Sequence, residues 1–234
     1  MPKDDPYSRL AVIPARGGSV RLKNKNIYPL AGKPLICHTI EAVIDSGRFD
    51  TIIVSTDSEL IAAEARNYSE VEIYDRPKQY ASEHITVLEA LLVMMDELKH
   101  HDIFAYFLPT CPFRNADDIS GGVDLLVPGV DSVISISQYI QPPQLAMLKR
   151  GDDLFPVFDN LTLGLTNSRY FTKYYKPNGG YYMGWWDTIK KNRNFFVDTI
   201  KGFELPQERT VDIDDIFDIH LAEQLLKNSR PSHK

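Results

Sequence analysis

Cysteine is scarce in this chain of 234 residues, and Cys37 and Cys111 are too few to form a disulfide scaffold. Apolar residues never run on for the roughly 18 positions that a membrane-spanning helix needs, and residues 1–5 lack the apolar core of a signal peptide. Basic residues are not in excess, because the formal net charge is −6 with both signs interspersed. These absences predict a cytoplasmic protein that binds neither duplex nucleic acid nor a membrane.

Short apolar runs rich in valine and isoleucine alternate with amphipathic stretches in the first half of the chain. The pattern predicts strands at 10–13, 51–55, 71–74 and 104–108, with helices at 35–44, 59–65 and 86–99 between them. Strands joined by crossover helices pair in parallel with right-handed connections. The sequence therefore predicts an α/β fold, an open and mostly parallel Rossmann-like sheet with helices on both faces, which binds ligands at the carboxyl ends of its strands.

This regular alternation stops after residues 132–137. Eight tyrosine, phenylalanine and tryptophan side chains crowd residues 170–186. A hydrophobic patch this dense is typical of a lid or a subunit contact, while completion of a second small core explains it equally well. We expect a small, irregular, aromatic-rich insert over residues 140–186, inside an α/β domain made of residues 1–139 and 187–234. That domain ends with a strand near 196–200 and a helix over 214–226.

The loop after the first predicted strand concentrates positive charge in an otherwise acidic chain. Its paired glycines let backbone N–H groups approach an oxyanion, and its cationic side chains can neutralise a polyphosphate. We interpret it as a triphosphate cradle, with a solvated basic turn as the alternative. It is neither a Walker loop nor a dinucleotide-binding fingerprint, because Gly-x4-Gly-Lys-Ser/Thr and Gly-x-Gly-x-x-Gly are both absent. Within residues 15–26 it contains Arg16, Gly17, Gly18, Arg21, Lys23 and Lys25.

Six short motifs occur in one order along the chain. The first is Ile-Pro-Ala-Arg-Gly-Gly-Ser at 13–19, followed by Lys-Asn at 25–26 and Leu-Ala-Gly-Lys-Pro-Leu at 30–35. The others lie at 54–57, 76–83, 109–114, 177–179 and 212–214. In this order they resemble the acylneuraminate cytidylyltransferases, the CMP-sialic acid synthetase family. The resemblance covers most of the chain.

The resemblance implies a fold of the nucleotide-diphospho-sugar transferase type. It also implies transfer of CMP from CTP to the anomeric hydroxyl of a nonulosonic acid, a 2-keto sugar acid, with release of pyrophosphate. Residues 140–186 would then form the sugar subsite and the contact of a homodimer. Two alternatives remain: another sugar or polyol-phosphate nucleotidyltransferase on the same fold, and a relative that binds a nucleotide without turnover.

The same resemblance assigns roles within the basic loop. Val20 stands where the family commonly has a lysine, so Arg21 is expected to be the main catalytic cation. Arg16 and Lys25 are the other catalytic candidates, and Gly17, Gly18, Ser19 and Asn26 are expected to bind substrate.

Arg76 and Ser82 occupy the positions that match cytosine recognition in the family. A guanidinium can donate to the O2 and N3 acceptors of cytosine, whereas N3 of uracil carries a hydrogen. Arg76 and Ser82 are therefore expected to select the base, although an Arg-Pro pair is otherwise an ordinary turn.

Asp212 and Asp214 flank a single residue, so on an extended segment both carboxylates project to the same face. Oxygen ligands of this kind fit one hard cation, and Mg²⁺ is the expected cofactor. The alternative is that Asp214 or Asp215 merely caps the last helix.

The acceptor implied by the resemblance carries a carboxylate, so at least one cation must face it. Arg169 is the first choice, with Lys149 or Lys176 as alternatives, and Asn178 matches a further substrate-binding position. Leu108 replaces the glutamine that usually precedes the 109–114 motif. This change favours a less polar acceptor of the legionaminate or pseudaminate type over N-acetylneuraminate.

Overall fold

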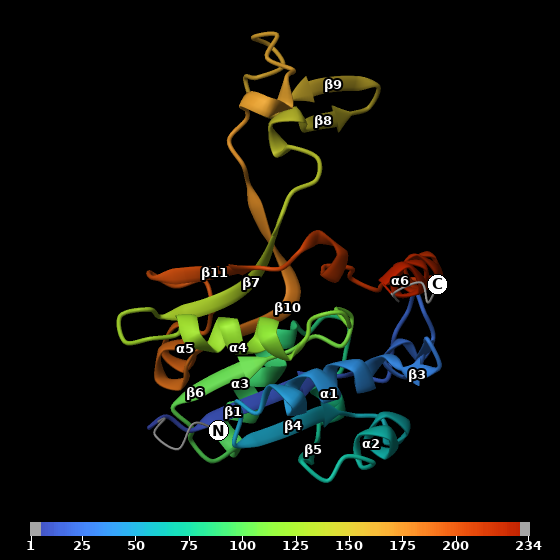
Figure 1. Cartoon of the computed structure of the whole chain (residues 1–234), viewed down its shortest axis with the longest axis vertical. Coiled ribbons are helices and arrows are strands. Elements are labelled where there is room, and N and C mark those ends of the chain that lie inside the picture. Colours follow the sequence, from blue (N-terminus) through green and yellow to red (C-terminus); the bar gives the residue numbers. More distant parts are fainter. Residues whose placement is uncertain (1–5, 230–234) are drawn as a thin grey trace, which may run out of the picture.

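Parallel pairing dominates the central sheet of the protein. In the computed structural model, which describes residues 6–229, seven strands follow the order β11-β7-β10-β6-β1-β4-β5 (Figure 1). Only β10 among them runs antiparallel to its neighbours β6 and β7. The predicted α/β sheet is therefore confirmed. The strands are β1 (Arg9–Pro14), β4 (Thr51–Thr56), β5 (Val71–Asp75), β6 (Ile103–Tyr106), β7 (Ser132–Gln138), β10 (Tyr175–Trp185) and β11 (Ile200–Glu204).

Helices cover both faces of the sheet. One apolar cluster joins α1 (Leu35–Ser46), α2 (Glu59–Ala65) and α4 (Ala116–Leu125) to one face. A second cluster joins α3 (Val87–Glu97) and α5 (Trp186–Asn192) to the other face. No helix in residues 6–229 combines the length and the apolar character needed to cross a bilayer.

A third apolar cluster lies beside the sheet, where α6 (Ile216–Ser229) packs near the short strands β2 (Pro29–Leu30) and β3 (Lys33–Pro34) (Figure 1). This cluster packs Leu22, Leu30 and Leu35 against Ile213, Ile219 and Ala222, so it brings the basic loop close to the acidic segment. Short 3₁₀ turns complete the fold at η1 (Lys25–Ile27), η2 (Lys78–Tyr80), η3 (Pro143–Leu145), η4 (Ser168–Tyr170) and η5 (Gln207–Arg209).

Helix α4 was not predicted from the sequence, because Gly121 and Gly122 are poor helix formers. Packing explains both glycines. A Cβ at Gly121 would overlap the ring of Phe203, and one at Gly122 would lie 2.6 Å from Cζ of the buried Tyr181. Two aromatic rings thus occupy the space that side chains on α4 would need.

Gly122→Ala tests this packing, because helix propensity predicts a gain in the free energy of unfolding and core packing predicts a loss. Alanine favours a helix over glycine by about 1 kcal/mol, whereas overpacking a core costs about 1–3 kcal/mol. Tyr181 donates its hydroxyl to Asp118 O at 2.9 Å, so the ring cannot easily move away. We expect a net loss of unfolding free energy, measured by urea denaturation. Ser120→Ala, on a more open side of the same helix, should not destabilise, and equal stability of the two variants would contradict the argument.

Residues 139–174 leave the sheet and form a projecting arm between β7 and β10 (Figure 1). The arm carries the hairpin of β8 (Met147–Arg150) and β9 (Asp153–Pro156). The insert predicted over 140–186 thus includes β10, which lies in the central sheet. The aromatic cluster divides accordingly: Tyr181 and Trp186 are buried in the core, whereas Tyr170 on the arm is 86% exposed.

Candidate active site

The third apolar cluster brings the basic loop against the acidic segment near residue 213. Leu22 and Leu30 from the start of the chain pack in it with Ile213 and Ile219. Ile213 also donates its backbone N–H to Thr110 O at 2.8 Å, which fixes the segment beside the turn after β6. Residues nearly 190 positions apart in sequence therefore meet, and Lys25 Nζ lies 2.9 Å from Asp214 Oδ1.

A cavity of about 410 Å³ opens at this junction, at the carboxyl ends of β1, β5 and β6. Strand β1 lies between β4 and β6 and is the point where the strand order reverses, which is where open α/β sheets bind ligands. Eight of the residues predicted from the sequence line the cavity: Arg16, Ser19, Lys25, Asn26, Arg76, Ser82, Asp212 and Asp214.

The two aspartates of the cavity differ in environment. Asp212 is exposed to solvent. Partial desolvation of its carboxyl and the nearby Asp214 raise its pKa, although a hydrogen bond with Thr110 and the charge of Lys25 act in the opposite direction. Burial acts in the same direction on Asp214, but the hydrogen bond with Lys25 and the charges of Lys25 and Arg21 outweigh it and lower its pKa. Two neighbouring carboxylates, one of which has a raised pKa, form an environment that a cation stabilises.

The acidic segment fits a magnesium ion in its donor set. Asp212 and Asp214 both line the cavity with oxygen donors, while no group of three histidine, cysteine or acidic side chains suited to a metal occurs in the described part of the chain. Mg²⁺ is commonly held by one or two carboxylates, with waters and substrate phosphates as its other ligands. Two carboxylates beside a cavity that is also lined by basic side chains match that pattern.

Capping of the last helix involves other carboxylates. Asp215 Oδ1 accepts hydrogen bonds from the N–H groups of Phe217 and Asp218 at 2.8 and 3.2 Å. Asp218 Oδ2 accepts those of Asp214 and Asp215 at 2.8 and 3.0 Å. The side chains of Asp212 and Asp214 are therefore not needed as caps.

Two glycines and one arginine of the basic loop lie differently from the prediction. The N–H of Gly17 donates to Asp57 Oδ1 at 2.9 Å, and neither Gly17 nor Gly18 lines the cavity. A Cβ at Gly17 would lie 2.9 Å from Ser58 Cβ, so this glycine is needed for close packing on the next loop. Arg21 lies outside the lining, with its side chain 66% exposed and Nη2 at 2.8 Å from Asp214 Oδ2. In this structure Arg16 and Lys25 are the loop cations at the cavity.

Arg76 enters the cavity as a buried guanidinium. Its Nη2 donates to Ser55 O at 2.9 Å and its Nε to Ser55 Oγ at 3.2 Å. A guanidinium has five N–H donors, so three remain for a ligand. Ser82 lines the same cavity, and the pair predicted to read the base is thus brought together.

The predicted acceptor residues lie outside this cavity. Arg169 is exposed on the arm, where it lines a separate hollow with Lys173 and Tyr174. Asn178 is buried at an irregularity of β10, where its Oδ1 accepts a hydrogen bond from Ser135 Oγ at 2.6 Å and its Nδ2 has no partner. The thiol of Cys111 donates to Asn178 O at 2.8 Å, and burial raises its pKa to about 12, so it is a packed thiol and not a nucleophile.

The connection between β5 and α3 contributes further residues to the cavity that were not predicted from the sequence, in addition to Arg76 and Ser82. Tyr80, Glu83, Ile85, Thr86 and Val87 line the cavity from this side. One signal was available, because Thr86 and Glu89 form a capping box that begins α3 at the cavity. The exposed turn before it has no periodicity from which its fold could be predicted.

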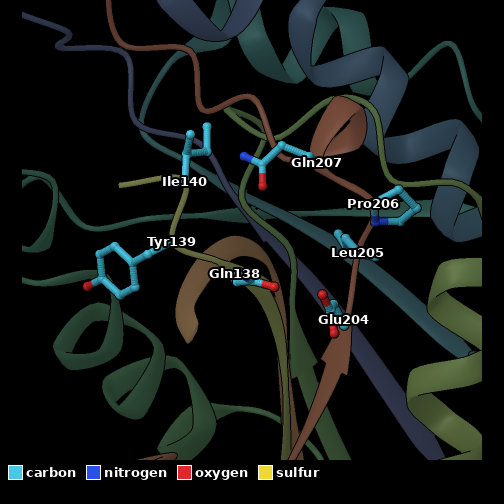
Figure 2. A pocket seen from close by; sticks show the side chains of 7 residues that line it. All are labelled: Gln138, Tyr139, Ile140, Glu204, Leu205, Pro206 and Gln207. Carbon is cyan, nitrogen blue, oxygen red and sulfur yellow. The ribbon is translucent and has the colours of Figure 1, made fainter. Parts of the chain in front are cut away.

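A larger hollow of about 550 Å³ lies at the base of the arm (Figure 2). Figure 2 shows Gln138, Tyr139 and Ile140 at the end of β7 facing Glu204 to Gln207 at the end of β11. Its lining contains one acidic side chain and no cation. It is therefore unsuited to a polyphosphate or a sugar carboxylate, and the cavity between the basic loop and the aspartates is the candidate active site.

Comparisons with known proteins identify the family of the chain. Residues 10–105 match the family model described as cytidylyltransferase. The CMP-N,N'-diacetyllegionaminic acid synthase of Legionella pneumophila is 32% identical over 226 residues, 93% of this chain and 96% of that protein. The N-acylneuraminate cytidylyltransferase of Escherichia coli O18:K1:H7 is 31% identical over 222 residues, and the match spans 91% of this chain but only 51% of that protein.

Among solved structures, CMP:2-keto-3-deoxy-manno-octonic acid synthetase complexed with CTP shares the fold. Its TM-score is 0.68 at 16% identity, with 94% of this chain and 99% of that chain covered. This similarity confirms the nucleotidyltransferase type of sheet. Together with the match to the Legionella protein over nearly all of both chains, it leads to one assignment: the chain belongs to the cytidylyltransferase family that includes the CMP-legionaminic acid and N-acylneuraminate enzymes.

Proposed function

We propose that the protein transfers CMP from CTP to the anomeric hydroxyl of a nonulosonic acid and releases pyrophosphate. The observation that supports this best is the cavity in which Arg16 and Lys25 face Asp212 and Asp214. Cations and a carboxylate pair that line the same cavity suit a triphosphate bound together with a divalent cation. The names of the two relatives, an N-acylneuraminate cytidylyltransferase and a CMP-N,N'-diacetyllegionaminic acid synthase, agree with this chemistry.

In the proposed reaction the acceptor oxygen forms a bond to the α-phosphorus while the bond to pyrophosphate breaks, and the hydroxyl proton is released. Such a transfer depends on positioning and charge neutralisation. Arg16 and Lys25 hold the phosphates and stabilise the charge that develops on pyrophosphate, while Arg21 assists from the rim. Asp212 and Asp214 would hold Mg²⁺, which when bound supplies a divalent positive charge beside the phosphates.

The acceptor is proposed to be less polar than N-acetylneuraminate. Leu108 lines the cavity together with Pro109 and Thr110, and its side chain offers no hydrogen bond to a sugar hydroxyl. A sugar hydroxyl placed against Leu108 would lose its hydrogen bond to water and gain none from the protein, which disfavours a fully hydroxylated sugar acid. A deoxygenated, legionaminate- or pseudaminate-type acid avoids this cost.

Pyrophosphate release with a panel of acceptors and nucleotides tests the function. Each of CTP, UTP and GTP is combined with N-acetylneuraminate, a legionaminate-type acid, a pseudaminate-type acid and a sugar 1-phosphate. We expect release with CTP and the two deoxygenated acids, with a lower kcat/KM for N-acetylneuraminate. Release only with a sugar 1-phosphate or only with UTP or GTP would contradict the proposal, as would nucleotide binding without release for any acceptor.

A second copy of this chain is the proposed partner of the arm, and the cytoplasm its proposed location. Leu154, Val157 and Leu163 on the arm are each more than half exposed, and an apolar projection of this kind favours a subunit contact. In such a dimer Arg169 could supply the cation for the acceptor carboxylate in the partner's cavity. Sedimentation is expected to give a dimer, and a monomer at micromolar concentration would contradict this part of the proposal.

A further inference from the structure

An ion pair outside the cavity joins the acidic segment to the start of α4. Arg209 donates through Nε to Asp118 Oδ2 at 2.9 Å and through Nη2 to Asp118 Oδ1 at 2.7 Å. The Asp118 side chain is 4% exposed and that of Arg209 is 32% exposed. Such a bidentate fork fixes the orientation of both groups and is stronger than a single exposed ion pair.

Asp118 is itself held rigidly. Its Oδ2 accepts the N–H of Asn115 at 3.0 Å, and its own N–H donates to Asn115 Oδ1 at 2.9 Å, which together form the capping box of α4. The hydroxyl of Tyr181, fully buried in the core, donates to Asp118 O at 2.9 Å. Arg209 is therefore attached to one of the most constrained points of the fold.

The backbone of the segment that contains Arg209 makes few hydrogen bonds to the rest of the protein before Ile213, which packs in the third apolar cluster. Leu205 donates its N–H to Ile136 O at 2.9 Å where β11 ends, and Ile213 is the next residue whose N–H bonds outside the segment. Between them the backbone bonds of Arg209 and Thr210 return to the same turn, at Pro206 and Gln207. Among the side chains described for residues 206–211, that of Arg209 makes hydrogen bonds to the rest of the protein, while the carboxylate of Asp212 is approached by Thr110 and by the Cys111 thiol.

We propose that Arg209 is a positioning residue for the Asp212–Asp214 pair. It lies three residues before Asp212, so its fork on Asp118 sets where the extended segment enters the cavity and which face its two carboxylates present. The inference rests on the proposed function, because it assumes that these carboxylates hold the divalent cation. Groups that orient metal ligands from outside typically change metal affinity or activity about 10–100-fold when they are replaced.

Arg209→Met removes the fork and keeps an apolar stem. We expect the Mg²⁺ concentration for half-maximal pyrophosphate release to rise about tenfold, while the KM for the acceptor stays within twofold. A second readout needs no turnover: in CTP alone, without acceptor, the further rise in Tm caused by added Mg²⁺ should be lost. Arg209→Lys keeps the positive charge but cannot form the bidentate pair. Its Mg²⁺ requirement should lie between those of the unsubstituted protein and Arg209→Met.

Arg48→Met is the matched control. Arg48 Nη2 lies 2.6 Å from Asp124 Oδ1 at the far end of the same helix, so this variant also removes an arginine attachment of α4. It should leave the Mg²⁺ requirement unchanged. If Arg209→Met proves too unstable, Asp118→Asn combined with Arg209→Met removes the unpaired buried charge and retains a capping side chain.

The outcomes separate this inference from the proposed function. A fall in Tm for Arg209→Met with an unchanged Mg²⁺ requirement would overturn the positioning role, because the ion pair would then serve stability alone. Absence of CTP-dependent pyrophosphate release from the unsubstituted protein would contradict the proposed function instead.

Discussion

Replacing Asp212 with asparagine is expected to lower kcat/KM for CMP transfer by about 10²–10³-fold, the usual effect of removing a group that stabilises developing charge. Asparagine has nearly the same shape but no negative charge, so one of the two carboxylates proposed to hold Mg²⁺ is lost. The measurement is pyrophosphate release at saturating CTP over a range of Mg²⁺ concentrations. Excess Mg²⁺ should restore only part of the activity.

The same substitution should not destabilise the protein. The pKa of Asp212 is raised in the folded state, chiefly by partial desolvation, so folding favours its neutral form, and its ionised form costs stability at neutral pH. Asparagine removes that cost, and we expect an equal or higher Tm without Mg²⁺. A loss of activity with an unchanged or higher Tm would then not be due to unfolding.

Asp215→Asn is the control for this prediction. Asp215 is exposed and caps α6 through its Oδ1, a role that asparagine also performs well. Near-normal activity is expected. If Asp215→Asn lost as much activity as Asp212→Asn, or if Asp212→Asn kept full activity, the assignment of the carboxylate pair would be wrong.

The parts of the fold that follow from local pattern could be predicted from the sequence. Apolar runs such as 10–13 and 51–55 became β1 and β4, because valine and isoleucine favour buried strands. Helix α4 and the antiparallel strand β10 were not identified. Both elements depend on contacts between residues far apart in sequence. Gly122 on α4 leaves space for Tyr181 of β10, and local helix or strand propensity cannot predict such a contact.

The candidate site divides in the same way. Charge and spacing, together with the resemblance to the family, identified the loop around Lys25 and the pair at Asp212 and Asp214, and the structure brings these together. The positions of Gly17 and Arg21 could not be predicted, because they depend on contacts with Asp57 and Asp214 across the fold. The link between Arg209 and Asp118 is equally invisible in the sequence, since the two residues are 91 positions apart.

For Lys25, contacts seen in the structure distinguish it from the other cations of the loop. Three cations of the loop are candidates for the phosphates, but the Lys25 side chain is only 15% exposed and lies 2.9 Å from Asp214. Its ammonium lines the cavity, whereas Arg21 lies at the rim with 66% of its side chain exposed. A partly desolvated cation interacts more strongly with a polyphosphate than one in water. We therefore propose that Lys25 contributes more than Arg21 to binding the phosphates.

Lys25→Met is accordingly expected to lower kcat/KM for CTP by about 10²–10³-fold, with a higher KM for CTP and a lower kcat. Lys23→Met makes the same change of charge on an exposed side chain of the same loop that does not line the cavity. It should change kcat/KM less than threefold, which separates a local contact from the general field of the loop. Equal losses in the two variants would mean that the loop acts only through its net charge. A larger loss for Arg21→Ala than for Lys25→Met would instead show that the loop closes on CTP, with Arg21 leaving Asp214 for the phosphates.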